Sequence, residues 1–348
     1  MVTERIAVAM SGGVDSSVAA ALLKQQSHEV VGVTMRVTDA PTKNIEDACA
    51  VAHKIGIPHH VIDLREVFEK EVIRPFAQSY ARGLTPNPCI VCNRVIKFGI
   101  LAQKARELGA QKLATGHYAR VVPYRGRLMV AAGRDAQRDQ SYFLFKLVHD
   151  DLDSVRFPVG EITKNEVRRI AKELDLGTAD KEESREVCFV PGDDYVPVVE
   201  RYADKLPGEG EIVLGNGEVV GRHNGVHHFT VGQRRGLNVA LGRPMYVIEI
   251  DAVRGRVIIG GNEECRSEGL VAKNVVWNYH KPIENNMEVD VRIRYGTRPI
   301  KARLFPLDEA KIKLIFSEDA PLVTPGQAAV FYLGDLVPGG GWIEKPIR

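Results

Sequence analysis

The chain has 348 residues, of which 44% are hydrophobic and 26% charged, and its formal net charge is +2 at pH 7. This length exceeds one ordinary hydrophobic core and predicts two or three domains. No apolar run approaches the roughly 20 residues of a membrane span, and the N-terminus lacks the apolar stretch of a signal peptide. We therefore expect a cytoplasmic protein with no membrane partner, whereas the small net charge neither requires nor excludes nucleic acid.

The first predicted element is a strand over residues 6–10 that runs directly into the turn Ser11-Gly12-Gly13-Val14-Asp15-Ser16-Ser17. Apolar residues at helical spacing follow. Glycines let backbone N–H groups approach phosphate oxygens, and serines add hydroxyl donors at a helix start. The turn therefore predicts a pyrophosphate-binding loop, distinct from the Walker and dinucleotide motifs. An ordinary Gly-Ser turn without a ligand is the alternative.

The pattern S-G-G-x-D-S resembles the PP-loop of ATP pyrophosphatases, enzymes that adenylate a substrate and release pyrophosphate. This resemblance implies ATP as a ligand, with Asp15 acting through Mg²⁺. The nucleotide-binding residues that it implies are Ala9, Met10, Ser11, Gly12, Gly13, Asp15, Ser16, Ser17, Met35 and Gly116.

Strands predicted at residues 29–35, 59–63 and 112–115 alternate with helical patterns, which is typical of a parallel sheet flanked by helices. A later helix is predicted by the capping box of Thr163 and Glu166. After about Pro191, turns rich in glycine separate short β-type runs, and strict alternation near the C-terminus predicts an antiparallel barrel. The expected α/β fold has a PP-loop, Rossmann-like parallel-sheet domain at 1–192, a small β-rich middle domain at 193–267 and a C-terminal β-barrel at 268–348.

Five cysteines in a chain of this size are too few and too unevenly placed for a secreted disulfide framework. Cys89 and Cys92 form a C-x-x-C pair directly before a predicted helix, where proximity to the helix N-terminus predicts a lowered thiol pKa. Cys188 lies near the end of the first expected domain. Cys49 falls on an apolar helical stripe and is interpreted as a core residue, and Cys265 is interpreted as a surface thiol.

Further motifs are spread over the whole chain: Asn87-Pro88, Cys92-Asn93, residues 115–118, 139–144 and 157–160, Cys188-Phe189, residues 232–237, Arg294-Tyr295 and residues 324–327. Together with the phosphate loop they resemble tRNA-specific 2-thiouridylases of the bacterial MnmA/TrmU type. The resemblance implies a tRNA-uridine 2-sulfurtransferase, which uses ATP to thiolate carbon 2 of the wobble uridine. The implied partners are tRNA and a sulfur source: a persulfide carrier, a cysteine desulfurase or free sulfide.

In that family, the cysteine matching Cys188 carries the incoming persulfide, and the one matching Cys92 is its partner thiol. Many members have the motif N-P-D-x-x-C, whereas this chain has Cys89 in place of the acid. Three thiols leave three arrangements open: the persulfide route, a [4Fe–4S] cluster on Cys89, Cys92 and Cys188 with one iron open to hydrosulfide, or a structural zinc lacking a fourth ligand.

Recognition of a folded RNA needs phosphate contacts over several domains and a flipped target base. The substrate contacts that the resemblance implies are Asn87, Pro88, His117, Arg138, Asp139, Gln140, Arg294, Tyr295 and Gln327. Arg292 and Arg294 lie opposite the apolar face of a predicted strand, so we expect both to be exposed. The pairs His59-His60 and His227-His228 alternate faces on predicted strands and are interpreted as structural.

Two other functions fit the phosphate loop. A PP-loop amidating synthetase would use ammonia as its nucleophile, but it would leave the cysteines and the barrel unexplained. An RNA-binding adaptor with a decayed nucleotide site would not need the intact glycines, serines and Asp15. ATP binding and pyrophosphate release in the presence of tRNA distinguish these functions.

Overall fold

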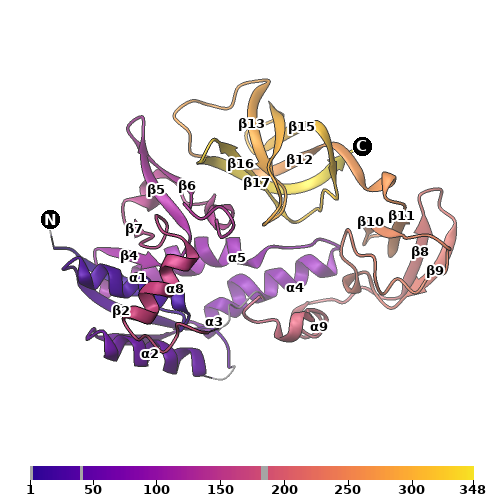
Figure 1. Ribbon diagram of the computed structural model, residues 1–348. Helices are drawn as coiled ribbons and strands as arrows, with labels where there is room; N and C mark the ends of the chain where they lie inside the picture. The colour runs from indigo at the N-terminus through magenta and orange to yellow at the C-terminus, as the bar shows by residue number, and fades with distance from the viewer. Residues whose placement is uncertain (1–2, 40–41, 182–186) are drawn as a thin grey trace.

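The computed structural model describes residues 3–39, 42–181 and 187–348. The N-terminal half forms an α/β unit, the C-terminal part forms a β-barrel above it, and a small sheet lies to one side (Figure 1). This architecture confirms the predicted fold class. Within the described residues, the helices are too short or too polar to cross a membrane.

The α/β unit is built on a parallel sheet with the strand order β3-β2-β1-β4-β7. Its strands are β1 Arg5–Ala9, β2 Glu29–Arg36, β3 His59–Asp63, β4 Lys112–Thr115 and β7 Val155–Arg156. Because parallel strands end at the same edge, the loops after β1, β2 and β4 lie next to one another. This edge carries the candidate site.

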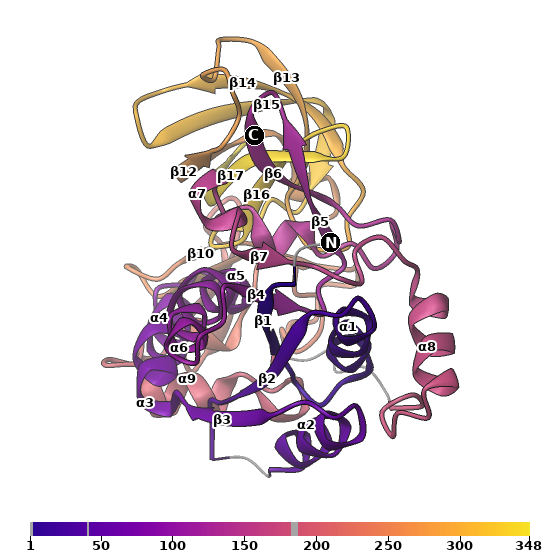
Figure 2. The same cartoon turned by 90° about the vertical axis from the view of Figure 1, so that its left-hand side faces the viewer.

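Helices cover both faces of the parallel sheet (Figure 2). One face packs against α1 Val14–Gln25, α2 Lys43–Lys54 and α8 Lys164–Glu173, and α8 begins with the predicted capping box of Thr163 and Glu166. The other face packs against α3 Arg65–Phe68, the π-helix Glu69–Ile73, α4 Arg74–Ala81, α5 Pro88–Val91, the π-helix Cys92–Leu101 and α6 Ala102–Glu107. Cys89 and Cys92 belong to this second layer.

A hairpin connects the α/β unit to the barrel. Its strands are β5 Ala119–Tyr124 and β6 Arg127–Ala132, and Ala131 pairs with Leu336 of the barrel. The chain returns through the 3₁₀ turn Ser141–Leu144 and α7 His149–Leu152. The barrel therefore rests on residues adjacent to the candidate site.

The small middle sheet has the order β10-β11-β8-β9 and its own hydrophobic core. Its elements are β8 Gly210–Leu214, β9 Val219–His223, the 3₁₀ turn Val226–His228, β10 Tyr246–Asp251 and β11 Arg256–Gly260. The 3₁₀ turn Pro191–Asp193 and helix α9 Val196–Tyr202 lead into it. Antiparallel pairing of β8 with β9 and of β10 with β11 agrees with the short β-type runs that the sequence predicts here.

The C-terminal strands close into an antiparallel barrel, because the first and last of them, β12 and β17, also pair with each other. The strands are β12 Arg266–Trp277, β13 Met287–Arg292, β14 Ile300–Pro306, β15 Lys311–Pro321, β16 Ala328–Leu333 and β17 Leu336–Ile347, after the 3₁₀ turn Glu263–Cys265. Alternate apolar side chains fill its interior.

Four local expectations were wrong. Cys49 is exposed, because α2 packs through Ala48, Val51 and Ala52, one helical step away. Cys265 is buried, because its turn packs under the sheet and its thiol reaches the carbonyl of Gly261. Arg292 is only 18% exposed, since the α/β unit covers its strand face. His227 and His228 lie on a 3₁₀ turn and not on a strand, so their rings do not point to opposite faces.

Candidate functional site

The phosphate loop is organised by its own serines at the start of α1. The Ser16 hydroxyl accepts a hydrogen bond from the Ser11 amide at 3.1 Å, and the Ser16 and Ser17 hydroxyls donate to the Gly13 carbonyl at 3.1 and 2.9 Å. The helix N-terminus therefore faces the cavity with its amides in place for an anion. This geometry fits the predicted pyrophosphate site.

Gly12 is required at the tip of this loop. Its φ is +70°, and a Cβ atom there would lie 2.2 Å from the carbonyl oxygen of Asn44. Lys181 closes the same corner, because its ammonium group donates to the Gly12 carbonyl at 3.0 Å and to the Asn44 side chain at 2.8 Å and pairs with Asp47 at 2.6 Å. Sequence reasoning missed Lys181, since nothing in the local pattern connects it with a loop at residue 12.

Asp15 is held by two side chains from distant segments. The Lys164 ammonium group lies 2.7 Å from one carboxylate oxygen and 2.9 Å from the other, and the Tyr118 hydroxyl donates to Asp15 at 2.6 Å. Asp15 is the carboxylate among the described residues that line the cavity, so it is a suitable ligand for a magnesium ion carried by a nucleotide. An ion bound there would share Asp15 with Lys164.

One cavity of about 430 Å³ connects the phosphate loop with the thiols. Its lining includes, from the predicted set, Ala9, Met10, Ser11, Asp15, Ser16, Met35, Pro88, Cys89, Cys92, Gly116, His117, Gln140 and Cys188. Gly12 and Gly13 directly precede α1, Ser17 is a buried residue of its first turn, and Asn87 is the N-cap residue of α5. The structure thus brings three thiols from two distant segments to the nucleotide loop.

The segment with Cys188 is anchored by the next residue. Phe189 packs edge to face against Phe68 at 5.7 Å and against Phe76 at 5.1 Å between ring centroids. These rings belong to the helical layer that also carries Cys92. Aromatic packing therefore fixes Cys188 beside the C-x-x-C pair, although residues 182–186 lie outside the described part of the chain.

The predicted lowering of the thiol pKa is wrong. Burial raises the pKa values of Cys89 and Cys92, and burial together with the neighbouring thiols raises the pKa of Cys188 to about 12. Lys97 acts in the opposite direction on all three groups. The loss of hydration outweighs the helix N-terminus here, although only Cys92 is buried while Cys89 and Cys188 keep exposed surface.

Lys97 owes its position to unusual backbone geometry. Cys92 begins a π-helix that extends to Leu101, and the i→i+5 hydrogen bonds of such a helix stack residues that are five positions apart. Lys97 lies five positions after Cys92, and both line the cavity. A regular helical pattern could not have predicted this pair.

His117 is a buried side chain that lines the same cavity. It is 8% exposed, and its Nδ1 lies 2.7 Å from the Thr115 hydroxyl. Burial and the nearby charge of Lys97 hold its pKa well below the ordinary value. At neutral pH the ring can therefore hydrogen-bond to a base without adding charge.

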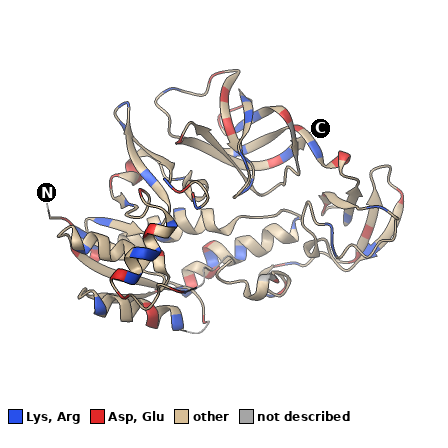
Figure 3. Ribbon diagram, in the orientation of Figure 1, with Lys and Arg blue, Asp and Glu red and all other residues tan. Residues whose placement is uncertain are grey.

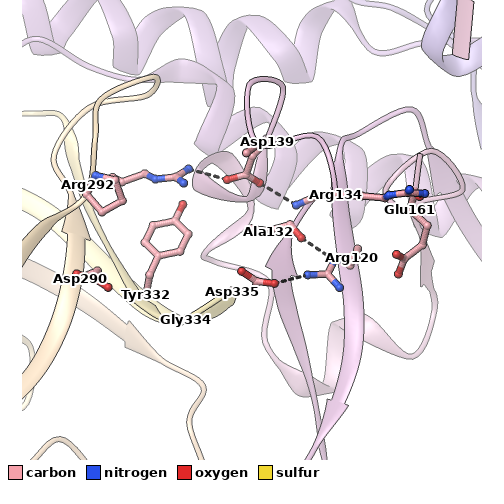
Figure 4. A pocket seen from close by; sticks show the side chains of 13 residues that line it. Arg120, Ala132, Arg134, Asp139, Glu161, Asp290, Arg292, Tyr332, Gly334 and Asp335 are labelled. Carbon is pink, nitrogen blue, oxygen red and sulfur yellow. Dashed lines mark hydrogen bonds and ion pairs between the residues drawn. The ribbon is translucent and has the colours of Figure 1, made fainter. Parts of the chain in front are cut away.

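Two predicted substrate residues lie in the contact between the barrel and the α/β unit. Asp139 is 1% exposed and pairs with Arg292 at 2.6 Å, beside a cavity of about 400 Å³ also lined by Tyr332 and Asp335 (Figure 4). Gln327 donates to the Thr85 carbonyl at 3.0 Å, a few residues before Cys89 and Cys92. Gln327 therefore joins the barrel to the segment before Cys89, and Asp139 joins it to the segment after β6. Their contact with RNA stays a prediction.

The other predicted RNA contacts lie outside the main cavity. Arg294 is exposed and donates to the Thr324 hydroxyl at 3.3 Å, and Tyr295 is 39% exposed with its ring 4.4 Å from that of Phe143. Arg138 is half-buried and lies just before Asp139. These three stay predictions.

Basic residues on the barrel do not form a uniform positive face. Lys301 lies 3.5 Å from Asp290, and Arg303 lies 3.5 Å from Glu288 on the neighbouring strand. Figure 3 shows acidic and basic residues side by side on these strands. Charge alone therefore does not identify this part of the barrel as an RNA surface.

A parallel sheet with a PP-loop at its carboxyl edge defines an ATP-binding protein of the PP-loop class. The family model described as tRNA methyl transferase HUP domain matches residues 4–192. Models described as tRNA methyl transferase PRC-barrel domain and aminomethyltransferase beta-barrel domain match residues 198–261 and 267–343.

Curated relatives match over nearly their full length and carry the name tRNA-specific 2-thiouridylase MnmA. The protein of Syntrophotalea carbinolica is 47% identical over 98% of this chain and 98% of its own. That of Geobacter metallireducens is 47% identical over 98% and 97%, and that of Geotalea uraniireducens 44% identical over 99% and 96%. The chain belongs to the MnmA family of tRNA-specific 2-thiouridylases.

Proposed function

We propose that this protein is an ATP-dependent tRNA sulfurtransferase that replaces the carbonyl oxygen at carbon 2 of the wobble uridine with sulfur. The observation that carries the proposal is the single cavity that joins the phosphate loop to Cys89, Cys92 and Cys188. An amidating synthetase has no use for these thiols, and an adaptor has no use for the ordered loop. We also keep the domain limits 1–192, 193–267 and 268–348 and a cytoplasmic location as parts of the proposal.

The first step activates the uracil. Oxygen 2 of the base attacks the α-phosphorus of ATP, the bond to the β-phosphate breaks, and pyrophosphate leaves while the oxygen becomes an adenylate. The amides at the start of α1 and the serines of the loop hold the phosphates. Mg²⁺ bound with ATP would offset phosphate charge beside Asp15.

The second step transfers sulfur. A persulfide on Cys188 attacks carbon 2, and the C–O bond breaks as AMP leaves, which places a disulfide between the base and Cys188. The Cys92 thiolate then attacks the Cys188 sulfur, forms a Cys92–Cys188 disulfide and releases 2-thiouridine. A thiol reductant restores both cysteines, and a persulfide carrier, a cysteine desulfurase or sulfide with an oxidant supplies the next persulfide.

A second route is favoured by one observation, the presence of Cys89 in the same cavity as Cys92 and Cys188. Three thiolates are a suitable ligand set for a [4Fe–4S] cluster, which would supply an open iron for hydrosulfide. A closed zinc site fits less well, because the three sulfur atoms, all described, do not form a group lying within 4.8 Å of one another.

The decisive experiment incubates the chain with tRNA carrying a wobble uridine, ATP and either a persulfide donor or sulfide. We expect 2-thiouridine in the digested tRNA by mass spectrometry, with stoichiometric pyrophosphate. Absence of thiolation with every donor, under air and without oxygen, would contradict the proposal. A chain purified without oxygen and assayed for iron and acid-labile sulfide decides between the routes, with C89A active on the persulfide route and inactive on the cluster route.

A further inference from the structure

A group of possible metal ligands lies far along the chain from the phosphate loop, where α9 meets the middle sheet. Glu200 of α9 and the adjacent residues His227 and His228 of the 3₁₀ turn place one donor atom each within 4.8 Å of the other two. The nearest Glu200 oxygen is 3.9 Å from Nε2 of His227. Two imidazoles and one carboxylate are a common ligand set for zinc.

His227 supplies an independent sign that a ligand is needed. Its side chain is only 3% exposed, and within the described parts of the chain neither of its ring nitrogens has a hydrogen-bond partner. A buried imidazole without hydrogen bonds is destabilising, so proteins rarely retain one without a use.

The backbone makes room for this ring. A Cβ atom on Gly225 would lie 2.4 Å from a carbon of the His227 ring, so only glycine is compatible with the ring at this place. His223 nearby has a different role, because its Nδ1 accepts the Gly225 amide at 3.0 Å and its proton therefore resides on Nε2. His223 is thus not a ligand in this tautomer.

We propose that Glu200, His227 and His228 form a binding site for a divalent zinc-class ion that fastens α9 to the middle sheet. Half-exposed Glu200 can move the short distance that coordination requires, since donor atoms around one zinc ion lie about 3–3.5 Å apart. The fourth position is left for water or another ligand. No step of the thiolation chemistry involves this ion.

The position of the site explains what the ion would do. Tyr195, just before α9, stacks on Tyr80 of α4 at 4.0 Å and shares a hydrogen bond with Thr230 at 3.2 Å. Helix α4 leads along the chain to the segment with Cys89 and Cys92. An ion between α9 and residues 227–228 would therefore hold the middle sheet in place next to α4, which precedes the segment with Cys89 and Cys92.

The test titrates Zn²⁺ into the full-length chain, prepared without a polyhistidine tag and with C89S, C92S and C188S so that these thiols cannot compete. We expect one zinc ion per chain by calorimetry and a rise in melting temperature with zinc. Co²⁺ should give visible d–d absorption without a thiolate charge-transfer band. The thiolation proposal is untouched by either result, because this chain lacks the catalytic cysteines by design.

Three substitutions probe the ligands separately. E200Q, H228A and H227Q should each weaken zinc binding by about tenfold or more, since even loss of a residue that only hydrogen-bonds to a metal ligand costs that much. H60A, which removes an exposed histidine from β3, should bind zinc as the parent does. E200Q and H228A change side chains that are not fully buried, so both are expected to fold. No zinc binding by the parent, or unchanged binding by these two variants, overturns the proposal.

Discussion

The phosphate loop and the three thiols of Cys89, Cys92 and Cys188 line one cavity, but they are assembled in different ways. The serine hydrogen bonds of the loop are local, because they join residues between Ser11 and Ser17, and Lys164 and Lys181 add contacts from far along the chain. The three thiols come from α5, from the π-helix that follows it and from a segment almost a hundred residues later. Their proximity depends on the packing of Phe189 and on the barrel contact of Gln327. ATP binding should therefore survive substitutions that abolish sulfur transfer.

The largest effect is expected for C188S. Loss of the persulfide-bearing sulfur should lower tRNA thiolation by about three orders of magnitude or more, because a nucleophile cannot be replaced by its neighbours. ATP binding, measured by equilibrium dialysis, should be unchanged. C49S is the matched control, since Cys49 is exposed and outside the cavity lining. Equal thiolation by C188S and C49S would contradict the persulfide role.

The next effect concerns the Asp139–Arg292 ion pair, which joins the α/β unit to the barrel. D139N leaves Arg292 half-buried without its charged partner and should destabilise the chain by about 3 kcal/mol, measured as a lower melting temperature. The double variant D139N/R292M should recover part of the loss. D290N removes a partner of Lys301, which is 80% exposed, and should change stability by about 0.5 kcal/mol or less. Similar effects of D139N and D290N would refute the importance of the contact.

A single added methyl group should disrupt the phosphate loop. G12A introduces a Cβ atom 2.2 Å from a backbone oxygen at a φ of +70°, and strain of about 2–3 kcal/mol should weaken ATP binding roughly a hundredfold. G56A tests the strain alone, because Gly56 has a φ of +66° and no atom of the described residues lies within 4 Å of an added Cβ. ATP affinity should be preserved in G56A, and an equal loss in both variants would exclude the clash as the cause.

The smallest effect should come from Lys97. Its charge lowers the pKa values of the three thiols, so K97M should raise these pKa values and reduce the fraction of thiolate at neutral pH. Below a raised pKa the thiolate fraction grows with pH, so thiolation by K97M should approach the parent rate in alkaline buffer. K97R retains the charge and should keep the parent profile. A defect of equal size at all pH values would mean that Lys97 does not act by lowering the thiol pKa values.

The sequence by itself determined the features that depend on neighbours along the chain. The strands at residues 59–63 and 112–115, the capping box of Thr163 and Glu166, and the turn at Gly12 were predicted because each follows from local periodicity or local hydrogen bonding. The alternation of barrel strands was predicted for the same reason. The family motifs also pointed correctly to Cys89, Cys92 and Cys188 as one group.

Tertiary structure alone decided the chemistry of those residues. The thiol pKa values are raised and not lowered, since burial by distant segments removed more solvation than the helix N-terminus could replace. Lys97 reached the cavity through a π-helix, and Lys181 and Lys164 reached the phosphate loop from far along the chain. Burial and charge depend on what packs nearby, and the order of residues does not specify that until the chain has folded.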